Sequence, residues 1–256
     1  MINRIPNIVH LMYGFAEDFG GKPFSLVHYL CIKSLCDLNK PDVVNFYYKY
    51  EPTGEWWEKA KPYLNLVEIE PPTEIFGNPL MHVAHQADIV RLQALIADGG
   101  IYIDLDVICT KPFTDLLDNK FVIGAEGTPH GTDGLCNAVL MSEPNSKFAT
   151  TWLSNYTNFR SKGRDQYWNE HSVYLPLHLS KQIPNEIHIE PYSSFHYPLY
   201  HEPHLKMMFE EINDFSDSYC HHLWETVSWE PYLRDLTIDD IKNNDTTFNL
   251  IARRFI

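Results

Sequence analysis

Residues 82–107 read HVAHQADIVRLQALIADGGIYIDLDV, and this stretch predicts a long helix that leads directly into a short strand. Apolar side chains recur every three or four positions along the helix and also fill most of its remaining surface, which is typical of a buried helix. Gly99-Gly100 ends the helix. Residues 101–103 then form a very short apolar strand, and Asp104 and Asp106 follow at its end.

The chain before this stretch alternates between strands and helices. Strands are predicted at residues 5–11, 43–48 and 64–69, and helices at residues 25–38 and 56–63. This alternation indicates a parallel sheet with right-handed crossovers. Such sheets bind ligands at the carboxyl ends of their strands, which is where the two aspartates lie.

The second half of the chain is predicted to extend the same α/β unit. Its expected elements are strands at 121–125, 138–141, 187–190 and 218–222, and helices at 145–159 and 172–182. Ser172 is a plausible N-terminal cap for the last of these helices. Because no repeat, low-complexity segment or linker interrupts the pattern, residues 1–256 are predicted to form a single domain.

Composition excludes several classes of protein. The 256 residues carry a net charge of −14, which argues against nucleic acid as a partner. Five cysteines without a C-x-x-C pair indicate reduced thiols rather than a disulfide scaffold. No apolar run approaches the ~20 residues of a membrane span, and a signal-peptide core is missing, so we expect a soluble cytoplasmic protein. The later histidines are too irregularly spaced to predict a zinc site: His196, His201, His204, His221 and His222.

Two charged residues, Asp88 and Arg91, occur on the otherwise apolar helix and share one side of it because they are three positions apart. A buried charge is costly unless it is paired or ligated. Two readings follow from these residues alone. They form an internal ion pair that only neutralises itself, or they line a polar cleft and hold a sugar hydroxyl and a phosphate.

Asp104 and Asp106 favour the second reading. At a strand end both carboxylates can reach one hard cation, and Mg²⁺ and Mn²⁺ prefer carboxylate oxygens together with substrate phosphates. A cation there would act as a Lewis acid on a departing diphosphate. D-x-D alone is weak evidence, but it follows Gly-Gly and a buried helix that carries D-x-x-R, which makes the combination much stronger.

This combination resembles the D-x-D sugar-binding region of glycosyltransferase family 32. The resemblance rests on residues 85–91 and 99–107, is dense over residues 80–113, and spans nearly the whole chain in patches that follow the family's order. Residues 5–10 are similar to the first strand of that family, residues 137–144 to the segment after its D-x-D, and residues 222–224 to its late H-x-W.

The resemblance implies a GT-A fold, which is a single Rossmann-like mixed sheet flanked by helices. Residues 1–110 would bind the nucleotide-sugar and residues 111–256 would form the acceptor side. The implied activity is transfer of a hexose, with retention of configuration, from a nucleotide-diphosphate sugar to a glycan hydroxyl. A UDP-sugar is favoured over a GDP-sugar, although Leu11-Met12-Tyr13 departs from the family pattern after His10 and leaves the base open.

The resemblance also assigns roles to residues. Asp106 would bind the metal (Mn²⁺ or Mg²⁺) directly, and Asp104 would contact the metal, the ribose or the sugar. His222, or its neighbour His221, would be a third ligand. Asp88 and Arg91 would hold the sugar and its phosphate side, and Arg91 would act in catalysis together with both aspartates.

Four further residues are expected at the donor, each with a plainer alternative. His10 faces the nucleotide or is a core histidine with satisfied nitrogens. Tyr13 stacks on the base or packs at the strand end. Asn137 lies near the reaction centre or in a turn. Trp224 covers the diphosphate or is buried in the core.

Two other functions use the same residues. A nucleotide-sugar hydrolase would need a positioned water and no acceptor groove, whereas the aromatic-rich residues 192–198 fit an acceptor platform. An inactive sugar-binding module would tolerate loss of the metal ligands, yet Asp104 and Asp106 are both present.

Overall fold

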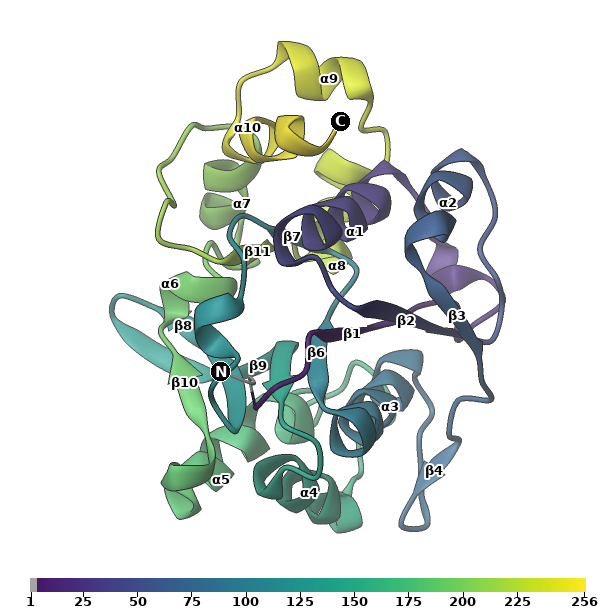
Figure 1. Ribbon diagram of the computed structural model, residues 1–256, viewed down its shortest axis with the longest axis vertical. Coiled ribbons are helices and arrows are strands. Elements are labelled where there is room, and N and C mark those ends of the chain that lie inside the picture. The colour runs from purple at the N-terminus through teal and green to yellow at the C-terminus, as the bar shows by residue number, and fades with distance from the viewer. Residues whose placement is uncertain (1–3) are drawn as a thin grey trace.

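A computed structural model describes residues 4–256, and a mixed seven-stranded sheet lies at its centre (Figure 1). The strand order is β10-β8-β9-β6-β1-β2-β3. The bounds of these strands are β1 Ile8–Met12, β2 Val43–Tyr48, β3 Asn65–Glu68, β6 Gly100–Ile103, β8 Phe121–Thr128, β9 Gly131–Ser142 and β10 His188–Glu190. β1, β2, β3 and β6 are parallel, whereas β9 runs antiparallel to both β6 and β8. The α/β class and the mixed sheet expected from the sequence are confirmed.

Helices cover both faces of the sheet. α1 and α2 lie on one face, and α3, α4 and α5 lie on the other (Figure 1). Their bounds are α1 Leu26–Asn39, α2 Glu55–Ala60, α3 Val83–Asp98, α4 Lys147–Ser154 and α5 Leu175–Gln182. Gly99 caps the end of α3 and Gly100 begins β6. Their φ angles of 68° and 106° lie in the region that favours glycine. The turn sends the chain directly into β6.

Alternation along β6 decides which side chains reach which face of the sheet. Ile101 and Ile103 belong to the core beneath α1 and α2, whereas Tyr102 belongs to the core beneath α3 and α4. The guanidinium of Arg91 on α3 lies 4.2 Å from the centre of the Tyr102 ring. The side chain of Tyr102 therefore lies on the face of the sheet that α3 covers, in contact with Arg91.

The C-terminal part of the chain forms a third core cluster against α1. Its elements are α7 Glu202–Phe209, β11 Cys220–His222, α8 Glu225–Ser228, α9 Ile238–Asn243 and α10 Thr247–Ala252. β11 pairs antiparallel with β7 (Val107–Cys109), so that His222 lies opposite Val107. Through this pairing, residues 220–222 lie beside the segment that directly follows Asp106.

Some predicted boundaries differ from the structure. The helix expected at 145–159 is α4 followed by a 3-10 turn over Asn155–Asn158. Ser172 is not an N-terminal cap, because it lies inside a π-helical segment, Glu170–Tyr174, that continues into α5. Its hydroxyl lies 3.5 Å from the carbonyl oxygen of Trp168, one turn back. A small hairpin of β4 (Glu74–Ile75) and β5 (Asn78–Pro79) was not predicted.

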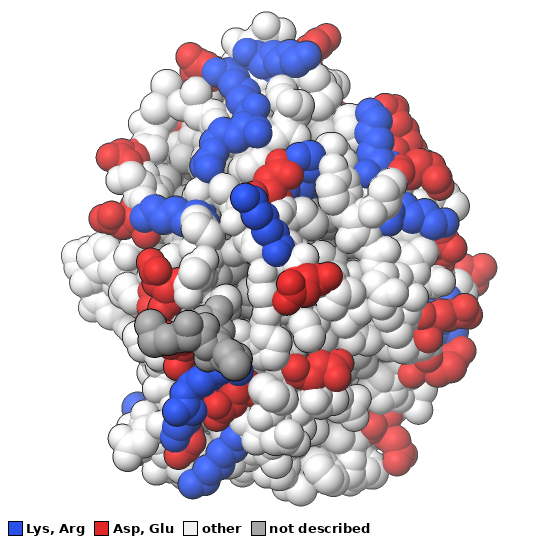
Figure 2. All heavy atoms as spheres, viewed as in Figure 1, with Lys and Arg blue, Asp and Glu red and all other residues white. Residues whose placement is uncertain are grey.

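The surface carries both signs of charge. Figure 2 shows Lys and Arg side chains interspersed with Asp and Glu across one face, without a single large patch of either sign. Among residues 4–256, no helix has the length and apolar character required to cross a membrane.

Candidate active site

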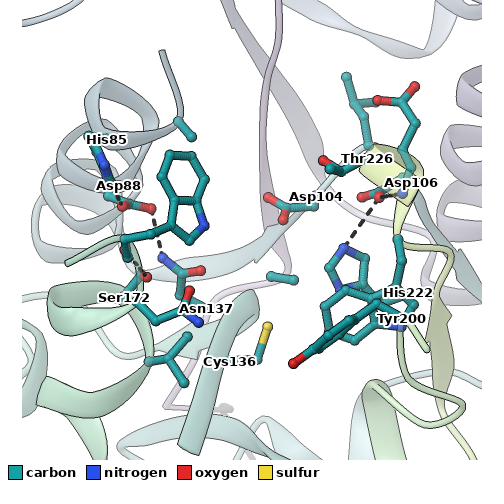
Figure 3. Close-up of a pocket in the computed structure, with 18 of the residues that line it drawn as sticks. His85, Asp88, Asp104, Asp106, Cys136, Asn137, Ser172, Tyr200, His222 and Thr226 are labelled. Atoms are coloured by element: carbon teal, nitrogen blue, oxygen red, sulfur yellow. Dashed lines mark hydrogen bonds and ion pairs between the residues drawn. The ribbon is translucent and has the colours of Figure 1, made fainter. Parts of the chain in front are cut away.

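A cleft of about 680 Å³ opens where β1 and β6 end. The residues on its walls come from both halves of the chain: Asp88 and Arg91 from α3, Asp104 and Asp106 from the turn after β6, Asn137 from β9, and His222 from β11 (Figure 3). The cleft therefore lies at the carboxyl ends of parallel strands, as the sequence predicted.

The turn after β6 holds both aspartates at the cleft. The N–H of Asp104 donates to the carbonyl of Ala138 at 2.8 Å, and the N–H of Val107 donates to the carbonyl of Asp104 at 3.1 Å. Oδ2 of Asp106 lies 3.3 Å from Nε2 of His222. One ligand atom from each of Asp104, Asp106 and His222 lies within 4.8 Å of the others. Two carboxylates and an imidazole fit a divalent cation such as Mn²⁺.

The two aspartates differ in their electrostatics. Burial raises the pKa of Asp106, but His222 and the N–H of Glu225 outweigh it and hold the pKa at about 2. Burial raises the pKa of Asp104 above its ordinary value; Arg91 opposes this rise, and the nearby charge of Asp106 adds to it. A cation between the two carboxylates would relieve their mutual repulsion, so the charge distribution also fits a metal site.

Asp88, Arg91 and Asn137 form one hydrogen-bonded unit in the opposite wall. Nη2 of Arg91 lies 3.2 Å from Oδ1 of Asp88, and Nη1 donates to the carbonyl of Asn137 at 2.7 Å. The amide of Asn137 donates to the same Oδ1 of Asp88 at 2.7 Å. Asp88 and Arg91 are each only 5% exposed, yet both line the cleft. The two alternatives from the sequence therefore describe one arrangement, an ion pair that lines a polar cleft.

The structure distinguishes between the two adjacent histidines. His222 lines the cleft beside Asp106, whereas His221 points into the protein and its Nδ1 donates to the carbonyl of Tyr197 at 3.0 Å. Burial lowers the pKa of His221 to about 4. The alternation of side chains along β11 thus directs only His222 toward the aspartates.

The aromatic residues expected at the donor have different placements. Tyr13 and Trp224 line the cleft; the Tyr13 hydroxyl donates to the carbonyl of Lys22, and the Trp224 indole N–H donates to the carbonyl of Pro198. The ring of Trp224 lies with its centroid 4.0 Å from that of His222. Both rings are thus anchored at their polar atoms in the wall of the cleft.

His10 lies outside the cleft. Its Nε2 donates to the carbonyl of Gly99 at 2.8 Å, and its Nδ1 accepts from the Tyr47 hydroxyl at 3.1 Å. Burial lowers its pKa, which matches a neutral ring with one donor and one acceptor nitrogen. This placement does not support the expectation that His10 faces the nucleotide, because both ring nitrogens are hydrogen-bonded to other parts of the protein, the carbonyl of Gly99 and the hydroxyl of Tyr47.

Several residues in the cleft were not singled out from the sequence. Glu126 on β8 is buried at the base, and Glu225 at the start of α8 pairs with His28 at 2.9 Å and with Lys22 at 3.1 Å. Trp168 and Tyr200 also line the cleft; Trp168 packs against His85 on α3, and Tyr200 packs against Trp224. Glu126 could have been singled out from the sequence, because it is the one acidic residue in the otherwise largely apolar strand FVIGAEGT.

Comparisons with known proteins agree with this geometry. Residues 21–122 match the family model described as the glycosyltransferase sugar-binding region containing DXD motif. Glucan organizing enzyme 1 of Cryptococcus neoformans var. grubii is 36% identical over 264 aligned positions, which cover 98% of this chain and 71% of that protein. Uncharacterized glycosyltransferase L373 of Acanthamoeba polyphaga mimivirus is 27% identical over 145 positions, covering 55% of this chain and 51% of that protein.

Solved structures show the same fold. The apo form of glycosyltransferase GlyE from Streptococcus pneumoniae TIGR4 superposes with a TM-score of 0.52 at 13% identity, covering 98% of this chain and 60% of that one. Mouse xyloside xylosyltransferase 1 has a TM-score of 0.50 at 12% identity, covering 86% of this chain and 98% of that one. The architecture is the GT-A fold, and the chain belongs to the glycosyltransferases whose sugar-binding region contains the DXD motif.

Proposed function

We propose that this glycosyltransferase moves a hexose from a nucleotide-diphosphate sugar to a glycan hydroxyl, with retention of anomeric configuration and dependence on Mn²⁺ or Mg²⁺. The observation that carries the proposal is the convergence of Asp104, Asp106 and His222 within 4.8 Å. These three residues would hold the cation. When bound, it supplies Lewis-acid stabilisation of the departing diphosphate.

The donor half of the site is proposed to work by positioning. Asp88 accepts from both Arg91 and Asn137, so its carboxylate is fixed before a sugar arrives. Arg91 adds a permanent positive charge to a wall that otherwise contains carboxylates. Preorganised charges of this kind stabilise developing negative charge without rearrangement during the reaction. Tyr13 is proposed to stack on the base, with a UDP-sugar favoured, and Trp224 to cover the diphosphate.

The acceptor half supports transfer rather than hydrolysis. Beside the charged residues, the cleft is lined by the aromatic side chains of Trp168 and Tyr200, which sugars can contact through their apolar faces. A hydrolase would have no need of aromatic side chains that hold a second sugar. The name of the Cryptococcus relative, glucan organizing enzyme, agrees with a glycan acceptor in this case. We propose one domain, residues 1–256, with residues 1–110 on the donor side and residues 111–256 on the acceptor side.

The first experiment is a calorimetric titration with UDP and, separately, with GDP, each with and without Mn²⁺. The proposal predicts that one nucleotide binds only in the presence of Mn²⁺, and that Asp106→Ala abolishes this binding. Asp118→Ala is the matched control, because Asp118 is an exposed acid outside the cleft. Binding that is indifferent both to Mn²⁺ and to Asp106→Ala would show that the metal-dependent mechanism is wrong. NMR of the product's anomeric signal tests retention.

A further inference from the structure

A second group of metal-ligating side chains lies at the base of the cleft. Cys136 comes from β9, His196 directly follows α6 (Tyr192–Phe195), and His222 comes from β11. The Cys136 sulfur and one ring nitrogen of each histidine lie within 4.8 Å of one another. Figure 3 shows the thiol of Cys136 pointing into the cleft, on the side toward His222. These residues are far apart in the sequence, so histidine spacing gave no indication of the cluster.

The nitrogens in this cluster lack ordinary partners. His196 is 0% exposed, and within residues 4–256 neither of its ring nitrogens makes a hydrogen bond. The carbonyl of Cys136 lies beside the ring, but not in hydrogen-bond geometry. Nδ1 of His222 is also buried without a partner among the described residues. Buried polar atoms are nearly always satisfied in folded proteins, and a bound ion is one of the few explanations for such exceptions.

The surrounding fold builds the cluster. A Cβ atom at Gly124 on β8 would lie 2.8 Å from Nε2 of His196, so the glycine leaves the space that the imidazole occupies. The His196 and His222 rings meet at 72° with their centroids 6.1 Å apart. Cys136 and His222 are positioned by the strand pairing of β9 and β11, and His196 is held where it directly follows α6.

The donor atoms favour a softer cation than the aspartates do. Neither ring nitrogen of His196 makes a hydrogen bond among the described residues, so the ring has a lone pair free to donate. Glu126 is buried beside the Cys136 thiol and is positioned to take the proton that a metal ion would displace. A thiolate with two imidazoles is a typical ligand set for Zn²⁺, whereas carboxylates suit Mg²⁺ and Mn²⁺.

We propose that Cys136, His196 and His222 form a zinc site, separate from the cation site of Asp104 and Asp106 and joined to it through His222. Zn²⁺ would form bonds to the Cys136 sulfur and to one nitrogen of each histidine, and the thiol proton would leave through Glu126 to solvent. Cys136 and His222 both line the cleft, through which an ion could enter. The two sites share His222, but Cys136 and His196 belong to the zinc site alone, so a failure to bind zinc would not by itself argue against the proposed transfer reaction.

The test uses Co²⁺ as a coloured substitute for Zn²⁺ on the full chain under reducing conditions. The wild type should develop a thiolate-to-cobalt charge-transfer band that one equivalent of Zn²⁺ removes. Cys136→Ser should abolish the band, and His196→Gln should weaken Zn²⁺ binding by at least about 100-fold. The band should persist in Cys36→Ser, which removes a half-buried cysteine on α1, and in Asp106→Asn, which disables only the other site.

Three outcomes would overturn the proposal: no charge-transfer band in the wild type, a band that survives Cys136→Ser, or a band that is lost in Asp106→Asn but intact in His196→Gln. A measurement on the wild type covers the case in which Cys136→Ser does not fold. Zn²⁺ should slow alkylation of Cys136 by iodoacetamide, as measured by peptide mass spectrometry, while Cys36 reacts at an unchanged rate. Equal rates for Cys136 with and without Zn²⁺ would contradict the site.

Discussion

The main-chain N–H of Glu225 donates a 2.7 Å hydrogen bond to Oδ2 of Asp106, although the two residues are 119 positions apart. The carbonyl of Asp106 in turn accepts from the N–H of Leu223 at 2.8 Å. These bonds tie the D-x-D turn to the start of α8 and fix the orientation of the Asp106 carboxylate before any ligand binds. A site that is already ordered loses less conformational entropy when its substrate binds, so more of the interaction energy contributes to affinity.

Arg91→Met should destabilise the protein by about 3–5 kcal/mol, because it leaves the buried carboxylate of Asp88 and the half-buried carboxylate of Asp104 without their counter-charge. Urea unfolding monitored by circular dichroism measures this loss. Arg234→Met is the control, since the ion pairs of Arg234 are on the surface and should contribute less than about 1 kcal/mol. Equal effects of the two substitutions would mean that solvent already screens the charges of the cleft.

Gly100→Ala should destabilise the protein more than Gly77→Ala. Both glycines have a positive φ, but a Cβ at Gly100 would lie 2.4 Å from the carbonyl oxygen of Ile8, whereas at Gly77 it meets nothing within 4 Å. Strain alone costs about 1–2 kcal/mol, and the clash should add about 1–3 kcal/mol at Gly100. Thermal unfolding of both variants separates the two effects. Similar losses would show that β1 and β6 separate easily.

Asn137→Ala should raise the KM for the donor and lower kcat/KM by about 10- to 100-fold. The substitution removes the N–H that orients Asp88, and a hydrogen bond to a charged group contributes about 1.5–3 kcal/mol. Initial rates with a sugar donor that carries the nucleotide selected by the titration measure the effect. Asn243→Ala, at an exposed position at the end of α9, should leave the kinetics unchanged. Unchanged kinetics in Asn137→Ala would remove Asn137 from the donor site.

Stability should fall as the pH decreases from 7 to 5, and part of this fall should come from His10. Burial lowers the pKa of His10 in the folded state, whereas the unfolded chain takes up a proton near the ordinary value of about 6.5. Below this ordinary value the unfolded state therefore binds more protons than the folded state does. The free energy of unfolding falls as the pH decreases from there to the lowered pKa of the folded state. Urea unfolding at each pH should show a smaller loss for His10→Gln and an unchanged loss for the exposed control His130→Gln. Identical slopes for His10→Gln and the wild type would contradict this assignment.

The sequence predicted those parts of the site that depend on local patterns. The helix over α3, the strand before Asp104 and the position of the aspartates all follow from periodicity and from Gly99-Gly100, and the structure has them close to the predicted bounds. Ser172 was misassigned because a cap residue and a residue inside a π-helical segment look alike when the preceding turn cannot be seen.

Long-range pairing explains what the sequence could not predict. The choice between His221 and His222 depends on the register of β11 against β7, and the cluster of Cys136 with His196 depends on packing between α6 and β8. Nothing in the spacing of these residues encodes either contact. For His10 the sequence pattern pointed to the site and the structure does not. The strand resembles that of the family, but the ring of His10 hydrogen-bonds to the carbonyl of Gly99 and the hydroxyl of Tyr47.

The pairing of β11 with β7 also sets an order of events during synthesis. Every strand of the seven-stranded sheet is complete by Glu190, whereas His222 is made later and is delivered to Asp106 only when β11 docks. The N-terminal part of a chain is available for folding first, while the ribosome is still adding residues. A nascent chain can therefore assemble the sheet and both aspartates while its ligand set is still incomplete, and the site is complete only after residues 220–222 have been made and have paired with β7.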